Sequence, residues 1–318
     1  SYVALAAFVG AFADSMPKWR VMFISNTIKI IGCAMMFFAV NPLLAYAVVG
    51  LGAAAYSPAK YGILTEYLPH RLLVVANGWI EGLTVIAIIL GTVLGGLLIK
   101  PDLAAAILAF DFPFIDTGID TVAEMNLLVI GTLYLVAALF NLHIPDTGVA
   151  HSPLKKNPLF LIHEFNHCLR LLWRDRLGQV SLAVTTLFWG AGSTLQFIVI
   201  EWAKAAMQMD LSHASMLQGV VAVGVAIGAF VAARYISLRR SVKVIPLGIA
   251  MGVGIIVMIL VPLIPALPLI DDAFVAFGHP LRLALDLRMA VSLLLLVVVG
   301  GFSGLFVVPM NALLQHRG

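Results

Sequence analysis

Eight long apolar segments decide what this chain can fold into. Each is long enough to cross about 30 Å of hydrocarbon as a helix, and together they occupy residues 21–40, 43–65, 73–99, 125–144, 179–203, 215–236, 244–264 and 288–314. Only 11% of all residues are charged, whereas soluble domains carry about 25%. The sequence therefore predicts an all-α integral membrane protein, for which we expect no nucleic-acid partner and no cofactor.

Both ends of the sequence lie in or beside apolar segments. Residues 1–13 look like the second half of a further span, and the chain stops at Gly318, just past the last one. We therefore expect a piece of a longer protein that lacks helices at both ends. The two cysteines, Cys33 and Cys168, fall in unrelated surroundings and indicate no disulfide framework.

The basic residues predict the orientation of the spans. Loops at 14–20, 66–72, 145–178 and 237–243, together with the C-terminus, hold 12 of the 19 Lys and Arg residues. The opposite loops hold only four, against nine acidic residues. Cytoplasmic loops of membrane proteins carry this excess of positive charge, so we place the first set of loops in the cytoplasm.

Two weak internal similarities occur in the same order in the two parts of the chain. The stretch at 10–22 begins with Gly-Ala-Phe and enters a basic loop, as does the stretch at 228–244. The stretch at 50–60 resembles that at 301–311, with Pro58 matching Pro309 and Lys60 matching Asn311. Such repeats are typical of transporters built from two related halves. The second half carries extra loop length, which we place at 265–287.

This pattern resembles the major facilitator superfamily, in which two helical halves surround a central cavity. The loop signature of that superfamily, G-x-x-x-D-x-x-x-x-x-R, is matched by Gly10, Asp14 and Arg20. The resemblance implies that these residues form a gating loop whose ion pair forms in one conformation and breaks in another. It also implies an N-terminal half at 1–144, a cytoplasmic linker at 145–178 and a C-terminal half at 179–318, with helices 1, 11 and 12 missing.

A metalloprotease signature, H-E-x-x-H, occurs at 163–167 in the predicted linker. His163 and His167 lie on one stripe of a helix with Arg170 and Arg174, opposite an apolar face. Catalytic zinc needs a third protein ligand and a shielded cavity, and no third-ligand motif follows. We interpret the segment as an amphipathic helix on the inner membrane surface and predict no metal site and no catalytic residue.

Ionisable residues inside spans are the strongest functional signals in a membrane protein. Lys60 and Glu81 lie in the cytoplasmic halves of adjacent predicted helices and could meet, either as an ion pair that fastens the helices or as charges that bind a zwitterion. Tyr56, one turn before Lys60, faces the same side. We interpret Lys29 as a residue that snorkels to the cytoplasmic face, and Glu201 as an interfacial anchor.

Three sequence stretches, at 41–64, 187–197 and 300–318, resemble the bacterial lysophospholipid transporter family (LplT) of the same superfamily. The resemblance implies a multi-pass protein of the bacterial inner membrane. It further implies movement of lyso-phosphatidylethanolamine and related lysolipids from the outer to the inner leaflet. There an acyltransferase or acyl-ACP synthetase, as a partner or fused to the transporter, would restore the second acyl chain.

The resemblance places Tyr56, Lys60 and Glu81 on the transport pathway, and we add Trp189, Gln196 and Asn311 from the same stretches. The alternative for an amide such as Gln196 is a purely structural contact between helices. The chain departs from the enterobacterial pattern at Gln196, where those members carry an arginine, and at His316, where they carry a glutamate.

Two other functions are compatible with the sequence. A drug/proton antiporter of the same superfamily would use Glu81 or Glu201 to carry a proton, although the G-x-x-x-G-P motif of antiporters is not met at 91–96. A membrane anchor for an acyltransferase would be indicated by a catalytic domain outside this chain.

Overall fold

The computed structural model describes residues 2–98, 108, 121–153, 155, 157–209, 211–265, 267–276 and 279–317. The chain forms two compact units. Unit 1 comprises residues 1–69 and 91–174, and unit 2 comprises residues 70–90 and 175–318. The predicted division into halves at 145–178 stays a prediction, and these units differ from it because residues 70–90 group with the second part of the chain.

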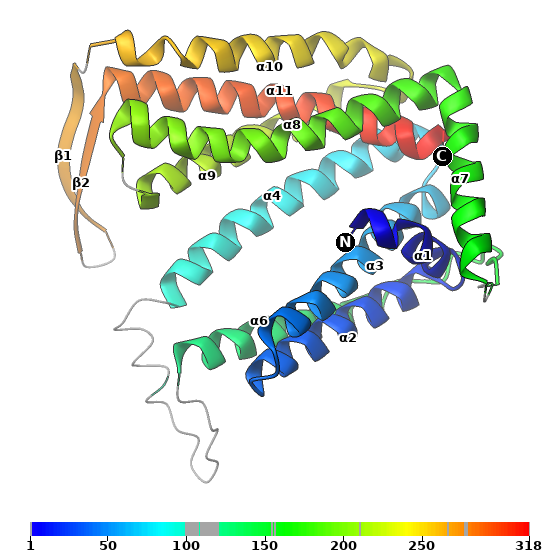
Figure 1. Ribbon diagram of the computed structural model, residues 1–318. Helices are drawn as coiled ribbons and strands as arrows, with labels where there is room; N and C mark the ends of the chain where they lie inside the picture. The colour runs from blue at the N-terminus through cyan, green and yellow to red at the C-terminus, as the bar shows by residue number, and fades with distance from the viewer. Residues whose placement is uncertain are drawn as a thin grey trace. The chain divides into compact units, whose positions relative to one another are not determined.

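Unit 1 is built from helices that the ribbon in Figure 1 colours from blue to green. They are α1 (Tyr2–Asp14), α2 (Lys18–Phe37), α3 (Pro42–Tyr67), α6 (Val122–Asn141) and α7 (Pro158–Arg174). Asn41 caps α3 by accepting hydrogen bonds from the backbone N–H groups of Leu43 and Leu44 at 3.0 and 3.3 Å. Thr121 and Glu124 form a reciprocal capping box at the start of α6.

Two glycines allow the backbones of α2 and α3 to approach closely. A Cβ atom on Gly32 would lie 2.5 Å from Cγ2 of Val49, and one on Gly52 would lie 2.7 Å from the carbonyl oxygen of Ser25. Without water to bond the backbone or drive helices together, spans associate through such small-residue contacts. The close approach holds α2 against the N-terminal half of α3.

Unit 2 begins with η1 (His70–Leu72) and residues 73–90 of α4 (Leu73–Leu98). It continues with α8 (Arg176–Met207), α9 (Leu211–Tyr235), η2 (Leu238–Val244), α10 (Ile245–Met258), η3 (Val261–Leu263) and α11 (Leu287–Arg317). Between α10 and α11, strands β1 (Pro268–Ala276) and β2 (His279–Asp286) pair antiparallel, with Ala276 opposite His279. This hairpin occupies the segment where the sequence predicted only extra loop.

Glycines fasten α9 to α11. Gly224 and Gly228 of α9 lie against the backbone around Gly301, while Gly300 and Gly304 of α11 lie against the backbone of α9. Any side chain at these four positions would overlap the partner helix. Pro309, further along α11, is fully buried.

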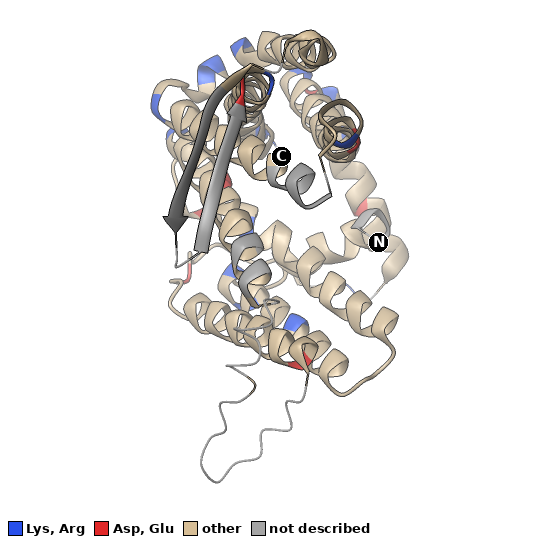
Figure 2. Ribbon diagram, turned by 90° about the vertical axis from the view of Figure 1, so that its left-hand side faces the viewer, with Lys and Arg blue, Asp and Glu red and all other residues tan. Residues whose placement is uncertain are grey.

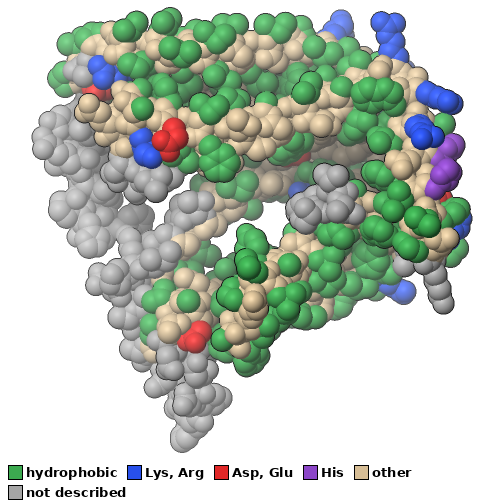
Figure 3. All heavy atoms as spheres, in the orientation of Figure 1, with side chains coloured by type: hydrophobic (Ala, Val, Ile, Leu, Met, Phe, Trp, Pro, Cys, Tyr) green, Lys and Arg blue, Asp and Glu red, His purple; other side chains and the backbone are tan. Residues whose placement is uncertain are grey.

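The prediction of a helical membrane bundle is confirmed. Eight described helices are long and apolar enough to cross a membrane, and a shorter apolar helix covers Leu5–Asp14. Lys, Arg, Asp and Glu are sparse along the spans (Figure 2). Large hydrophobic side chains face outward, as on Leu43 at 83% and Ile249 at 72% exposure, and they cover much of the face in Figure 3. Apolar surface of this extent is suited to lipid rather than to water.

Candidate functional site

Lys29, in the middle of α2, lies among neutral partners in unit 1. Its Nζ donates a hydrogen bond to Oδ1 of Asn26 at 3.1 Å. The same ammonium lies 4.4 Å from the ring centroid of Tyr56 on α3 and 5.2 Å from that of Tyr134 on α6. Both distances are within the range of cation–π attraction. Among the residues that the structure describes, no carboxylate forms an ion pair with Lys29.

Lys60 brings a second positive charge to the same cluster. It is close enough to Lys29 for the two ammonium groups to interact electrostatically, and its Nζ lies 5.2 Å from the ring centroid of Tyr61. Two like charges inside spans repel each other and cost free energy unless an anion or water compensates them. The Lys29 ammonium, whose described partners are neutral, is therefore suited to binding an anionic group. We call Asn26, Lys29, Tyr56, Lys60 and Tyr134 the lysine–tyrosine cluster.

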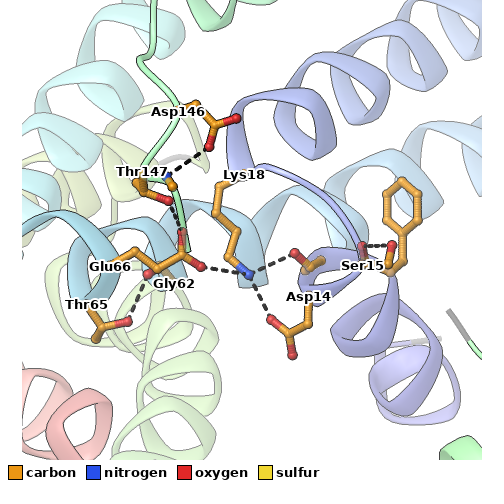
Figure 4. Close-up of polar contacts among 11 residues, drawn as sticks. Asp14, Ser15, Lys18, Gly62, Thr65, Glu66, Asp146 and Thr147 are labelled. Carbon is orange, nitrogen blue, oxygen red and sulfur yellow. Dashed lines mark hydrogen bonds and ion pairs between the residues drawn. The ribbon is translucent and has the colours of Figure 1, made fainter. Parts of the chain in front are cut away.

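The loop between α1 and α2 carries the ion pair that the sequence led us to expect there, with a different basic residue. Nζ of Lys18 lies 2.7 Å from Oδ1 of Asp14 and 3.3 Å from Oε1 of Glu66 on α3. It also donates to the carbonyl oxygen of Ala13 at 2.8 Å. Figure 4 shows the Lys18 side chain reaching between these groups. Lys18 is only 5% exposed, so its charge is compensated almost entirely by protein.

The linker is tied to this network through Glu66. Thr147 donates a hydrogen bond from Oγ1 to Oε2 of Glu66 at 2.9 Å (Figure 4). Arg20, the basic residue of the signature, is instead exposed, with its guanidinium 5.1 Å from the ring of Trp19. The gating role of Gly10, Asp14 and Arg20 stays a prediction, and the structure adds Lys18 and Glu66 to the residues that such a gate would involve.

Unit 2 contains two polar contacts between α4 and α11. Asn311 donates from Nδ2 to Oε1 of Glu81 at 3.3 Å. One turn away on each helix, Nδ2 of Asn77 donates to Oε1 of Gln315 at 2.8 Å, and Nε2 of Gln315 donates back to Oδ1 of Asn77 at 3.0 Å. Asn77, Glu81 and Asn311 are buried. The structure thus brings the predicted residues Glu81 and Asn311 together.

The other predicted pathway residues lie elsewhere. Trp189 on α8 is 53% exposed. Gln196, also exposed, donates from Nε2 to Oε1 of Gln218 on α9 at 2.9 Å. This is the structural contact between helices that was the alternative to a pathway role.

Lys60 belongs to unit 1 and Glu81 to unit 2, so their direct meeting stays a prediction. Glu201 pairs with Lys204 at 2.9 Å on an exposed surface, consistent with an interfacial anchor.

The H-E-x-x-H segment lies on α7 (Figure 1). His163, Glu164 and His167 are all exposed. Within the described part of the chain, no three His, Cys, Asp or Glu side chains gather in a way that could hold a metal ion. The apolar residues Ile162 and Phe165 are each 41% exposed, so both faces of this amphipathic helix are accessible.

Comparison with known proteins identifies the family of this chain. The model of the Major Facilitator Superfamily matches residues 1–318. The lysophospholipid transporter LplT of Yersinia enterocolitica is 38% identical over 100% of this chain and 68% of its own length. The LplT proteins of Yersinia pestis and Yersinia pseudotuberculosis are each 37% identical over the same shares.

The chain belongs to the LplT family of the major facilitator superfamily. Its relatives in the LplT family are named as transporters, and its eight apolar helices make it a multi-pass membrane protein. The family assignment confirms the resemblance read from the three stretches. It assigns no role to single residues, so the pathway residues remain predictions.

Sequence reasoning missed Lys29 as a member of the site in this LplT-family chain. It interpreted the residue as snorkelling, whereas the structure places the ammonium against two tyrosine rings. A signal was present, because Ser25, Asn26 and Lys29 form a polar stripe at helical spacing in an otherwise apolar span. Tyr134 could not be linked to Lys29 from the sequence, since nothing there fixes how α6 packs on α2.

Proposed function

We propose that this chain transports lysophospholipid across the bacterial inner membrane, from the outer to the inner leaflet. Support comes from the LplT relatives, whose printed name is lysophospholipid transporter, and from the lysine–tyrosine cluster. A lysophospholipid has one phosphate, a small head and one acyl tail. It would need few charges within apolar walls, which is what the spans of unit 1 provide.

The observation that carries the proposal is the environment of Lys29. Its ammonium is held by an amide oxygen and two aromatic rings, and Lys60 adds positive charge beside it. Both lysines would attract the substrate phosphate, because a charged donor forms strong hydrogen bonds to phosphate oxygens. The tyrosine rings would hold the ammonium groups in place while the phosphate is absent.

The headgroup preference rests on Glu81. We propose lyso-phosphatidylethanolamine as the main substrate, with Glu81 attracting its ammonium group. The Glu81 carboxylate is buried and accepts a hydrogen bond from the neutral amide of Asn311, so the ammonium group would add a charge–charge contact to that hydrogen bond. We further propose that the product is re-acylated in the inner leaflet by an acyltransferase, either a separate partner or fused to the full-length protein.

The test is uptake of labelled lyso-phosphatidylethanolamine by spheroplasts that lack their own lysolipid transporter. The full-length protein would be compared with its Lys29→Ala and Lys60→Ala variants at equal membrane abundance. Lys204→Ala is the matched control, because it removes an exposed lysine whose pair with Glu201 lies outside the cluster. We expect uptake to fall at least about tenfold in both cluster variants and to persist in the control.

Other outcomes of the same assay separate the alternatives. Normal uptake by both cluster variants would reject the phosphate site while keeping the transport function. No uptake by a well-folded full-length protein would reject lysolipid transport. Drug export that follows a proton gradient and is lost in Glu81→Gln would then support the antiporter.

A further inference from the structure

A groove on unit 2 runs between the first turns of α4 and the last turns of α9. It has a volume of about 220 Å³ and is lined by Val75, Gly78, Trp79, Gly82, Leu83, Ile86, Ala226, Phe230, Ala233 and Arg234. Nine of these ten side chains are apolar or glycine, and Arg234 is the exception. None belongs to the lysine–tyrosine cluster or to the polar contacts between α4 and α11, so the proposed transport function leaves this groove without a role.

The groove is open to the surroundings of the protein. Trp79 is 59%, Leu83 56% and Phe230 62% exposed. Its floor exists because Gly78 lets α4 approach α9, since a Cβ atom there would lie 2.5 Å from Cβ of Ala233. At Gly82 a Cβ atom would meet nothing within 4 Å, so the groove is open beside that residue. A long apolar ligand could therefore enter from the side.

The length of the groove matches one leaflet of a bilayer. Residues 75–86 of α4 correspond to about 16 Å of helix at 1.5 Å per residue. Half of a hydrocarbon core of about 30 Å is close to the same length. Because Arg234 lies in the last turn of α9, the groove extends from the end of the span towards the middle of the membrane. An acyl chain whose headgroup stays at the interface would fill it.

Arg234 supplies the charge that such a headgroup would meet. Its side chain is exposed and has no hydrogen bond or ion pair with any residue that the structure describes. It is one of four basic residues within the predicted spans. Lys29 and Lys60 belong to the cluster in unit 1, and Arg288 donates to the carbonyl oxygen of Ile264. A guanidinium binds phosphate oxygens in a bidentate manner. Trp79 is an aromatic residue of the kind enriched at membrane interfaces.

We propose that the α4–α9 groove is a binding site for an anionic glycerophospholipid of the leaflet on the Arg234 side. One acyl chain lies along Leu83, Ile86 and Phe230, and the phosphate contacts Arg234. The lipid is a bound component of the protein rather than transported cargo. The proposal does not depend on lysolipid transport.

The test is native mass spectrometry of the purified full-length protein titrated with phosphatidylglycerol or with phosphatidylcholine of the same chains. We expect one phosphatidylglycerol to bind at concentrations about tenfold lower than phosphatidylcholine, through the charge on Arg234. Arg234→Gln should remove the headgroup preference. Gly82→Leu should weaken binding of both lipids, because its side chain would project into the groove from a position where a Cβ atom meets nothing within 4 Å.

Two matched controls separate this site from general lipid contact. Arg240→Gln removes an exposed arginine of η2 that does not line the groove, and Gly252→Leu adds a side chain on α10 where a Cβ atom would also meet nothing within 4 Å. Both should bind phosphatidylglycerol as the parent does. Trp79 fluorescence provides a second measurement, with phosphatidylglycerol whose acyl chains are brominated as the quencher. The fraction of Trp79 emission that is quenched, obtained as the difference between the parent and Trp79→Phe, should exceed the mole fraction of the brominated lipid. Equal binding of the two lipids by the parent, equal losses in Arg234→Gln and Arg240→Gln, or unchanged binding in Gly82→Leu would each overturn the proposal.

Discussion

Asn77 and Gln315 exchange two hydrogen bonds, at 2.8 and 3.0 Å, so that each side-chain amide is both donor and acceptor for the other. Asn77 is fully buried, and its Nδ2 also donates to the carbonyl oxygen of Leu73 at 2.9 Å. The pair connects residues that are 238 positions apart in the sequence. Together with Glu81 and Asn311, it fixes which faces of α4 and α11 meet.

This amide pair should show coupling in a double-mutant cycle. Asn77→Leu leaves the amide of Gln315 without its partner and should cost about 1–3 kcal/mol of stability. Adding Gln315→Leu removes the unpaired group, so the double variant should be less destabilised than the sum of the single variants. Polar pairs in membranes have coupling energies of about 0.6–2 kcal/mol. Thermal unfolding of the full-length protein in detergent measures the cycle, and additive losses would contradict the pairing.

Substitution of Lys18 should destabilise the protein more than substitution of Asp14, its acidic partner on the surface. Asp14 is 69% exposed, whereas Glu66 is 15% exposed. Asp14→Asn should therefore cost no more than about 1 kcal/mol. Lys18→Met removes the buried cation and leaves the partly buried Glu66 carboxylate without it, and breaking a buried pair costs about 3–5 kcal/mol. Lys204→Met, in an exposed pair, is the control. A larger loss in Asp14→Asn than in Lys18→Met would refute this order.

The tyrosine rings of the cluster should act through their faces rather than their hydroxyl groups. Tyr56→Phe keeps the ring beside Lys29 and should leave lysolipid uptake close to that of the parent. Tyr56→Leu removes a cation–π contact of about 0.5–2 kcal/mol and should raise KM several-fold. Initial uptake rates over a range of lysolipid concentrations provide the measurement. If Tyr56→Phe is as impaired as Tyr56→Leu, the hydroxyl group is what matters.

The glycines between α9 and α11 should tolerate no side chain. Gly304→Val would place its side chain against the backbone of Val225 and Ala229 and should cost at least about 1–3 kcal/mol from overpacking. Gly252→Val, where a Cβ atom would meet nothing within 4 Å, should be close to neutral. The yield of monodisperse protein and its unfolding temperature distinguish the two. Equal stability of both variants would mean that α9 and α11 do not pack through Gly304.

The two cysteines should report on the orientation of the linker. Cys168 on α7 is exposed and Cys33 on α2 is buried. A membrane-impermeant maleimide should label Cys168 in inside-out vesicles but not in intact spheroplasts, because α7 is expected on the cytoplasmic side. Cys168→Ser should abolish this labelling while Cys33→Ser preserves it. Labelling of Cys168 from outside the cell would invert the predicted topology.

The sequence predicted the spans closely, because each is a long apolar run bounded by charges or turns. Asn41 and Pro42 mark the start of α3 through capping and a fixed backbone angle. The hairpin at 268–286 was missed because the segment was assigned only as extra loop length, although Gly278 and Pro280 are turn-type residues between its two apolar stretches. The contribution of α4 to unit 2 was missed as well, since packing between helices depends on which faces meet and not on hydropathy.

Residues at the site were predicted where one helix carries the signal, and missed where two helices must meet. Tyr56 and Lys60 are one turn apart on α3, so their common face follows from helix periodicity. Glu81 and Asn311 were each singled out, but nothing in the sequence paired them. Lys18 was overlooked in favour of Arg20, because the superfamily signature includes Arg20 and not Lys18. The burial of Lys18 beside Gly62 and Glu66 depends on how α3 packs against it.

The contact of α9 and α11 through their backbones has a mechanical consequence. Because carbonyl groups rather than flexible side chains meet at Gly224, Gly228, Gly300 and Gly304, neither helix can rotate or slide against the other without overlapping atoms. In any conformational cycle the two helices must move together as one rigid unit. Bending can then occur only at positions beyond the contact. In α11 it is easiest at Pro309, because proline lacks the N–H needed for an i to i−4 hydrogen bond.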